Sequence, residues 1–171
     1  MKKILTCLLA CALLFGASIG TVMAEEAAAP PPPAAKAGDP VAPWSAKNAE
    51  TGEVVRSDAI QGDYALVFVN SSCAACRGEL AVVAGMETKG LSVFMVSTDL
   101  DASRAIKIYR GALKLQFPIL DGSDFTLGTL FDISATPATV IVKDKKVTFH
   151  QSGFAQRHKD AIIAAFGVYK K

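Results

Sequence analysis

The amino-acid sequence predicts an α/β sandwich built around a mixed β-sheet. Two apolar runs without polar alternation, residues 64–70 (YALVFVN) and 91–97 (LSVFMVS), are typical of strands that are covered on both faces. The stretch between them has a helical pattern, so the two strands should be parallel and joined by a right-handed crossover. Residues 138–153 have the pattern of an antiparallel hairpin. Parallel and antiparallel strands together imply a mixed sheet with helices packed on it.

Two elements flank the first predicted strand. Residues 47–63 are expected to form a short N-terminal hairpin that turns at Thr51–Gly52. After the strand, a helix is predicted from Cys73 to about Lys89, because Gly90 provides a stop signal. Its apolar stripe consists of Leu80, Val83, Ala84 and Met86.

The second half of the chain continues the alternation of strands and helices. Residues 102–113 are predicted to form a helix that begins after Asp99 or Asp101, either of which can act as its N-cap. Ala105, Ile108 and Tyr109 fall on one face of this helix. The remaining elements are a short helix, the hairpin and a final helix, at residues 124–132, 138–153 and about 156–169.

The N-terminus has the three parts of a secretory signal peptide. Lys2 and Lys3 are followed by an apolar segment and by a site of the A-x-A type ending at Ala24. We therefore expect a signal peptide at residues 1–24 and an exported, periplasmic protein. Two alternatives stay open: the segment could remain as a membrane tether, or the chain could be lipidated at Cys11.

The residues after the signal divide into a linker and one domain. Residues 25–40 are rich in alanine and proline and carry almost no bulky apolar side chain, which is typical of a semi-rigid, solvated linker. The remaining residues, 41–171, suit one domain with a single core.

Composition after removal of the signal argues against several functions. The whole chain has 18 basic and 16 acidic residues, and the loss of Lys2 and Lys3 makes the two counts equal at 16. We therefore expect no nucleic-acid partner. Two of the four cysteines also lie in the signal, which leaves Cys73 and Cys76. Two thiols are too few for a multi-disulfide framework or for a closed zinc site.

Cys73 and Cys76 form a Cys-Ala-Ala-Cys pair where the first strand passes into the first helix. Free backbone N–H groups and the positive end of the helix dipole favour a thiolate at this position. Cysteines of such pairs at helix N-termini have thiol pKa values well below the usual value of about 8.5. Cys76 lies one turn deeper and should be more buried. Redox exchange is therefore the preferred interpretation.

Two other uses of the pair are weaker. A purely structural bridge would close a very small loop and would restrict the unfolded chain little. A copper or zinc site would need further ligands, and the only histidines, His150 and His158, are more readily explained as surface residues. The sequence therefore predicts neither a metal nor another cofactor.

From Val41 to the C-terminus, the chain resembles the thioredoxin superfamily, specifically its exported TlpA/ResA-like thiol-disulfide oxidoreductases. The features that carry this resemblance are the apolar strand ending in Cys-X-X-Cys, Glu79 three residues after Cys76, and the proline-containing stretch FDISATPATVIVKDKKV. The resemblance implies a thioredoxin-like three-layer sandwich with a mixed central sheet and an N-terminal hairpin extension. It also implies a disulfide reductase that needs no cofactor.

The resemblance assigns roles to individual residues. Cys73 would be the exposed nucleophile and Cys76 the resolving thiol. Glu79 could raise the pKa of a nearby thiol and relay a proton, although a helix-surface glutamate is an equally good interpretation. Thr136 would precede a cis peptide bond to Pro137. The exposed backbone there, together with Ala135, would bind the partner polypeptide.

This sequence also departs from the family pattern at three positions. Ser72 stands where the family usually has tryptophan, and Ala75 where it often has proline. Val67 stands where many relatives keep a buried polar or acidic group. These differences leave the substrate range open.

The resemblance also implies partners. Proteins of this branch often reduce apocytochrome c before haem attachment, and they receive electrons from a membrane thiol-disulfide transporter. We therefore expect protein disulfide substrates and such a membrane electron donor. A peroxiredoxin would have threonine or serine at Asn70, and a copper chaperone on the same fold would have a wider cysteine spacing. Both remain alternative functions.

Overall fold

The computed structural model describes residues 34–88 and 90–169. The predicted signal peptide, residues 1–24, and the first part of the predicted linker lie outside the described residues. The strands are β1 (Ser45–Lys47), β2 (Val54–Arg56), β3 (Asp63–Val69), β4 (Met86–Glu87), β5 (Leu91–Ser97), β6 (Ile119–Asp121), β7 (Ala138–Lys143), β8 (Lys146–Ser152) and β9 (Val168–Tyr169). The helices are α1 (Ala74–Ala84), α2 (Ala102–Gly111), α3 (Thr126–Leu130) and α4 (Gln156–Phe166).

A five-stranded mixed sheet lies at the centre of the fold. Its strand order is β6-β5-β3-β7-β8. β3, β5 and β6 are parallel to one another, whereas β7 is antiparallel to both β3 and β8. The N-terminal hairpin of β1 and β2 is also present. The prediction of an α/β fold with a mixed sheet and a hairpin extension is confirmed.

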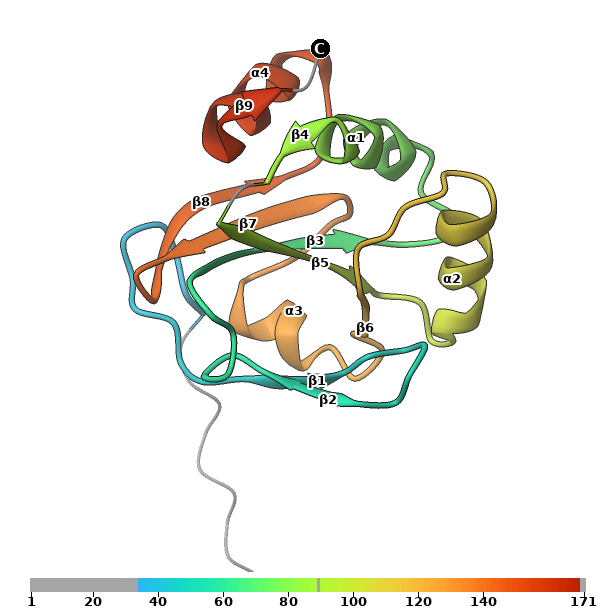
Figure 1. Ribbon diagram of the computed structural model, residues 1–171, viewed down its shortest axis with the longest axis horizontal. Helices are drawn as coiled ribbons and strands as arrows, with labels where there is room; N and C mark the ends of the chain where they lie inside the picture. The colour runs from blue at the N-terminus through green and yellow to red at the C-terminus, as the bar shows by residue number, and fades with distance from the viewer. Residues whose placement is uncertain (1–33, 89, 170–171) are drawn as a thin grey trace, which may run out of the picture. The chain divides into compact units, whose positions relative to one another are not determined.

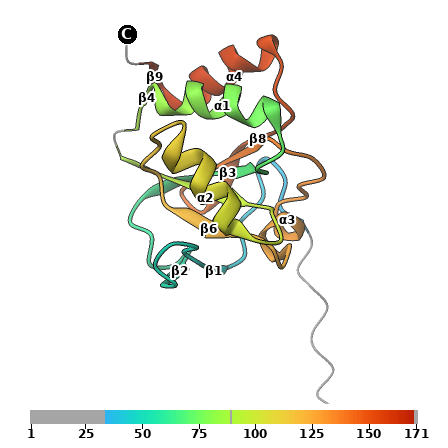
Figure 2. The ribbon, with the colours of Figure 1, turned by 90° about the vertical axis from the view of Figure 1, so that its right-hand side faces the viewer.

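The sheet separates two apolar clusters, as expected for a three-layer sandwich. Ala65, Val67 and Val69 of β3 belong to the cluster that contains side chains of α1, α2 and α4. The alternate residues Leu66 and Phe68 belong to the cluster beneath α3 and the hairpin. Figures 1 and 2 show α1 and α4 on one side of the sheet, with α3, β1 and β2 on the other. Burial on both faces explains why β3 has no polar alternation.

All four helices end earlier than predicted, and the last turns of α1 and α4 are replaced by strands. α1 ends at Ala84, and the Gly85 N–H donates to the Val82 carbonyl at 3.0 Å. The predictions of a helix to Lys89 and of a final helix to residue 169 are therefore wrong. Met86 begins β4, which pairs with β9. This pairing of segments that are distant in sequence outweighs the helical pattern of each segment.

The end of the predicted linker lies against the domain. Ala35 is buried, and its N–H donates to the Leu130 carbonyl at 2.7 Å. The Gly38 N–H donates to the Val147 carbonyl at 2.8 Å. Residues 34–40, which we expected to be a solvated linker, are therefore part of the folded unit because their backbone pairs with the β8 hairpin.

One edge of the central sheet gathers several loops. Since β3, β5 and β6 are parallel, the loops that follow them all leave the sheet at the same edge. β7 begins at this edge, where Ala138 pairs with Phe68 near the end of β3. The Cys-Ala-Ala-Cys pair therefore lies at the same edge as the Thr136–Pro137 segment.

Among the residues that the structure describes, none of the helices has both the length and the apolar character needed to cross a bilayer.

Candidate active site

Cys73 is the N-cap residue of α1 and forms a disulfide bond with Cys76. Their Cα atoms are 5.3 Å apart. Cys76 is completely buried, whereas Cys73 is only partly buried. The backbone N–H of Cys76 donates to the Cys73 Sγ atom at 3.0 Å. The same donor and the N-terminal dipole of α1 would stabilise a thiolate on Cys73.

The loop between β3 and α1 is shaped by Asn70. Its carbonyl accepts a hydrogen bond from the Cys73 N–H at 3.0 Å, and its side-chain oxygen accepts one from the Ser72 N–H at 3.0 Å. The Tyr109 hydroxyl of α2 also donates to the Asn70 carbonyl, at 2.8 Å. Burial, reinforced by the nearby Asp99 carboxylate, raises the pKa of Tyr109 to about 12, so the phenol remains a donor.

Asp99 holds the same loop from the end of β5. Its carboxylate accepts hydrogen bonds from the Ser71 N–H at 2.9 Å and from the Ser71 hydroxyl at 2.7 Å. The Ser97 hydroxyl also donates to it, at 3.0 Å. Asp101, not Asp99, caps α2 by accepting from the Ser103 N–H. Asp99 therefore fixes the residue two positions before Cys73.

We expect Asp99→Asn to lower the free energy of unfolding by about 1–2 kcal/mol, because an amide cannot accept all three hydrogen bonds and carries no charge. Urea unfolding followed by circular dichroism would measure the change. Asp160→Asn is a matched control, since Asp160 is exposed on α4. An equal loss in both variants would contradict the role of Asp99 as an anchor.

Glu79 lies in the interior, between α1 and the sheet. Only 1% of its surface is exposed, and its carboxylate accepts a hydrogen bond from the Thr139 hydroxyl of β7. Burial raises the pKa of Glu79 to about 7, although the Thr139 hydrogen bond opposes the shift. Glu79 is therefore not a surface residue. It is three residues, or about one helical turn, from the buried Cys76, and it can gain or lose a proton near neutral pH.

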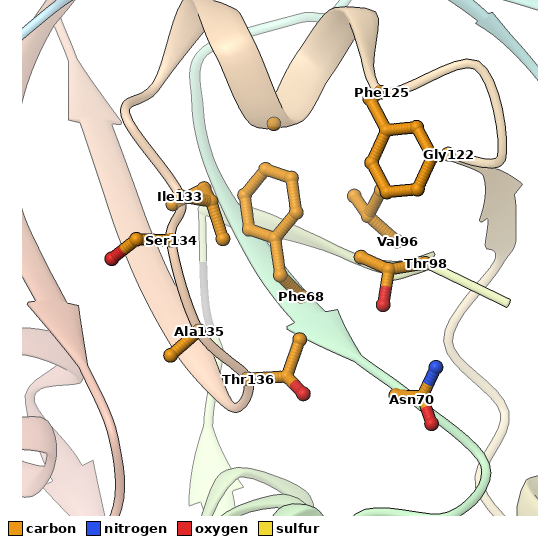
Figure 3. Close-up of a pocket in the computed structure, with 11 residues that line it drawn as sticks. Phe68, Asn70, Val96, Thr98, Gly122, Phe125, Ile133, Ser134, Ala135 and Thr136 are labelled. Carbon is orange, nitrogen blue, oxygen red and sulfur yellow. The ribbon is translucent and has the colours of Figure 1, made fainter.

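The Thr136–Pro137 peptide bond is cis. Ala135 and Thr136 line a pocket of about 250 Å³ that also includes Asn70. Figure 3 shows Thr136 and Asn70 at the same end of this pocket. The structure therefore places the loop before Pro137 beside the loop that leads to Cys73.

Four residues that shape the site were not predicted from the sequence as parts of it: Ser71, Asp99, Tyr109 and Thr139. Thr139 could have been recognised from the sequence, because it is the only polar residue in the apolar run 138–142. It is paired with Val67 on β3, so it supplies a hydroxyl next to a position where a polar group was missing. The contacts of Asp99 and Tyr109 depend on the packing of β5 and α2 against β3, which has no local signature.

The two histidines lie on other parts of the fold. The His150 Nε2 atom is 2.8 Å from the Phe131 carbonyl oxygen, and the His158 Nδ1 atom is 3.1 Å from the Gly153 carbonyl oxygen. Within residues 34–88 and 90–169, no three His, Cys, Asp or Glu side chains are grouped so that they could hold a metal ion.

Comparison with protein-family models and with curated protein sequences finds no match. Several solved structures, by contrast, are similar to the structure of this chain. A Chlorobium tepidum protein assigned as a thiol:disulfide interchange protein DsbE is 24% identical, with a TM-score of 0.65 over 78% of this chain and 100% of its own. StoA of Bacillus subtilis is 19% identical, with a TM-score of 0.55 over 70% and 95% of the two chains. The exposed lipoprotein thioredoxin of Streptococcus pneumoniae is 20% identical, with a TM-score of 0.59 over 73% and 98%. At these identities the likeness concerns the fold, and the chain has the thioredoxin-like fold that its sequence predicts.

Proposed function

We propose that the protein is a thiol-disulfide oxidoreductase that reduces disulfide bonds in exported proteins. The arrangement of the Cys73–Cys76 disulfide carries this proposal. Its outer sulfur lies at the N-terminus of α1, within reach of a hydrogen-bond donor, while its inner sulfur is buried one turn below. An exposed nucleophile and a shielded resolving thiol are what sequential disulfide exchange requires. Structural neighbours that are named as thiol-disulfide interchange proteins and oxidoreductases support the same activity.

The exchange proceeds in two displacement steps. In the reduced protein, the Cys73 thiolate attacks one sulfur of the partner disulfide, forming a mixed disulfide and releasing the second partner sulfur as a thiolate. Cys76 then loses its proton and attacks the Cys73 sulfur, which releases the first partner sulfur. The partner gains two electrons and two protons, and the protein returns to the Cys73–Cys76 disulfide. An external dithiol must reduce this disulfide before the next cycle.

Glu79 is the proton acceptor that we propose for the second step. Cys76 is fully buried, so its thiol has no direct access to water as a base. Glu79 is a near neighbour on the same helix, and its pKa of about 7 allows it to take a proton at neutral pH and release it later. The hydroxyl of Thr139 holds the carboxylate in place.

The proposed site of action is the periplasm. The signal-like N-terminus supports export, and one structural neighbour is described as an exposed lipoprotein. By resemblance, the substrates include apocytochrome c, and a membrane thiol-disulfide transporter supplies the electrons. Ala135, Thr136 and Pro137 are the proposed contacts for the partner backbone. A membrane tether through residues 1–24 is the alternative to removal of this segment as a signal peptide.

Reduction of insulin with dithiothreitol tests the proposal directly. We expect the protein to accelerate the precipitation of insulin B chains well above the rate with dithiothreitol alone. Peroxide consumption and copper co-purification should be measured on the same preparation. Peroxidase activity without insulin reduction would favour a peroxiredoxin, and copper bound through the two thiols would favour a copper chaperone. Either result would contradict the reductase assignment.

A further inference from the structure

The sheet edge that carries Cys73 also exposes large apolar side chains. Among the described residues, three large apolar side chains are exposed: Val54, Leu100 and Phe125. Leu100 follows β5 and is 85% exposed, and Phe125 follows β6 and is 54% exposed. Because β3, β5 and β6 are parallel, both residues leave the sheet at the edge where Cys73 lies. Exposed apolar side chains at the edge that carries a reactive sulfur indicate a binding surface.

The pocket at this edge has an apolar interior and a polar end. Figure 3 shows Phe68, Val96, Ile133 and Phe125 around its interior, beneath α3. Asn70 and Thr136 lie at the other end, and Thr98 stands beside Val96. Since the Asn70 carbonyl binds the Cys73 N–H, the polar end is continuous with the loop that carries the disulfide. An apolar side chain in the pocket would therefore belong to a chain segment passing close to Cys73.

Phe125 has an unfavourable backbone conformation, and its side chain is not buried in a way that would offset the cost. Its φ of 58° lies in the left-handed region, which residues other than glycine, asparagine and aspartate rarely adopt. The ring is 54% exposed, so packing in a core does not offset the cost. It stands at the rim of the pocket (Figure 3). Strain of this kind is typical of residues that serve binding.

The loops around the pocket are acidic. Asp99, Asp121, Asp124 and Asp132 each lie next to, or one residue away from, a residue that lines the pocket. No lysine, arginine or histidine lies within two positions of any lining residue. None of the four aspartates forms an ion pair with a described residue. Basic and acidic residues are equal in number outside the predicted signal, so this negative charge is local.

We propose, on the basis of the proposed function, that this pocket and its acidic rim select the substrate: a cationic, extended polypeptide segment whose apolar side chain enters the pocket beside the disulfide to be reduced. The negative rim attracts lysine or arginine side chains and accelerates encounter. The uncharged interior excludes a charged side chain, because burying it would leave the charge unpaired. Charge selects the partner, and the apolar side chain places the disulfide next to Cys73.

Three synthetic peptides, each closed by one disulfide, separate the two contributions. The first has a leucine and two arginines beside its cysteines, the second has the leucine with two glutamates, and the third has the arginines with serine in place of leucine. The reduced full chain is mixed with each peptide, and the initial rate of peptide reduction is measured at low and at high salt. We expect the first peptide to react roughly tenfold faster than either of the others at low salt. The advantage over the glutamate peptide should shrink at high salt, because salt screens the rim.

Variants at the pocket assign these preferences to particular residues. Asp124→Asn combined with Asp132→Asn should reduce the preference for arginine over glutamate by roughly 2- to 5-fold. At position 124, an asparagine side-chain oxygen can still accept the hydrogen bond from the Thr126 N–H, and at position 132 asparagine tolerates the left-handed φ. Phe125→Asn should reduce the preference for leucine over serine without straining the backbone. Asp160→Asn, an exposed site on α4 across the sheet, is the control and should keep both preferences.

Each other result is decisive. Equal rates for the three peptides, or preferences that survive in both pocket variants, would overturn the selective pocket and leave the oxidoreductase function standing. If the wild-type protein reduces none of the peptides and also fails to reduce insulin, the proposed function and the selective pocket both fall.

Discussion

Replacing Cys73 by serine is expected to lower the protein's own contribution to insulin reduction by at least about a thousandfold, which leaves the rate with dithiothreitol alone. A serine hydroxyl is not ionised near neutral pH and cannot form the mixed disulfide. Circular dichroism of the variant should match that of the wild type, because Cys73 is only partly buried at the edge of the core. Retained activity would show that the exchange does not begin at Cys73.

Replacing Cys76 by serine should have a different effect, because Cys73 remains able to attack. The mixed disulfide forms but is not resolved, so a partner stays covalently attached to Cys73. We expect a species of higher mass on non-reducing gels that disappears when dithiothreitol is added. The Cys73→Ser variant is the matched control and should trap nothing. If the two variants behave in the opposite way, the assigned roles of the two cysteines are wrong.

Glu79→Gln is expected to change how stability depends on pH. In the folded protein, burial raises the pKa of Glu79 from 4.5 to about 7, so the folded state keeps a proton that the unfolded chain has released between these values. The stabilisation from this protonated group is complete below pH 4.5 and is lost as the pH rises through about 7. Over that range, the free energy of unfolding of the wild type should fall by about 3 kcal/mol relative to that of the glutamine variant.

Urea unfolding at about pH 4.5 and pH 8 would measure this difference. Glu53→Gln, at an exposed glutamate before β2, is the matched control and should follow the wild-type pH dependence. Parallel pH profiles of wild type and Glu79→Gln would mean that Glu79 ionises normally in the folded protein.

Glu79→Gln should also slow the resolution of the mixed disulfide, because glutamine cannot accept the Cys76 proton. We expect the resolution rate at pH 7 to fall by roughly a hundredfold, as is typical for the loss of a general base. The formation of the mixed disulfide by Cys73 should be much less affected. Rapid-quench measurements with a disulfide peptide separate the two steps. Equal slowing of both steps would contradict the proposal that Glu79 acts specifically as the base for Cys76.

Local sequence patterns were sufficient for β3, β5, β7 and β8 of the central sheet, whereas the short edge strand β6 was not predicted. β3 and β5 were recognisable because seven-residue apolar runs bounded by polar or turn residues leave few alternatives. The ends of α1 and α4 were not, because β4 and β9 compete with the last helical turns. The pairing of β4 with β9 involves two residues from each strand, and neither segment alone has a sequence pattern that predicts it.

The candidate site was predictable in part. Cys73 and Cys76 stood out because of their spacing and their position after a strand, and their difference in burial follows from the geometry of a helix N-terminus. Glu79 could not be assigned, since a glutamate in an amphipathic helix is buried or exposed according to what packs above it. The exposed position of Phe125 was equally hidden, because the run around it predicts only a short helix.

The sequence by itself determined the longer strands and the helices in their order, the reactive pair and its place at the start of a helix, because these depend on residues that are close along the chain. The tertiary structure decided the state of Glu79, which depends on burial against the sheet and on Thr139, sixty residues away. It also decided that the loops after β5 and β6, with their aspartates and exposed apolar side chains, lie at the sheet edge that carries Cys73. Parallel strands bring their ends to one edge whatever the distance in sequence, and only the folded sheet makes that edge a site.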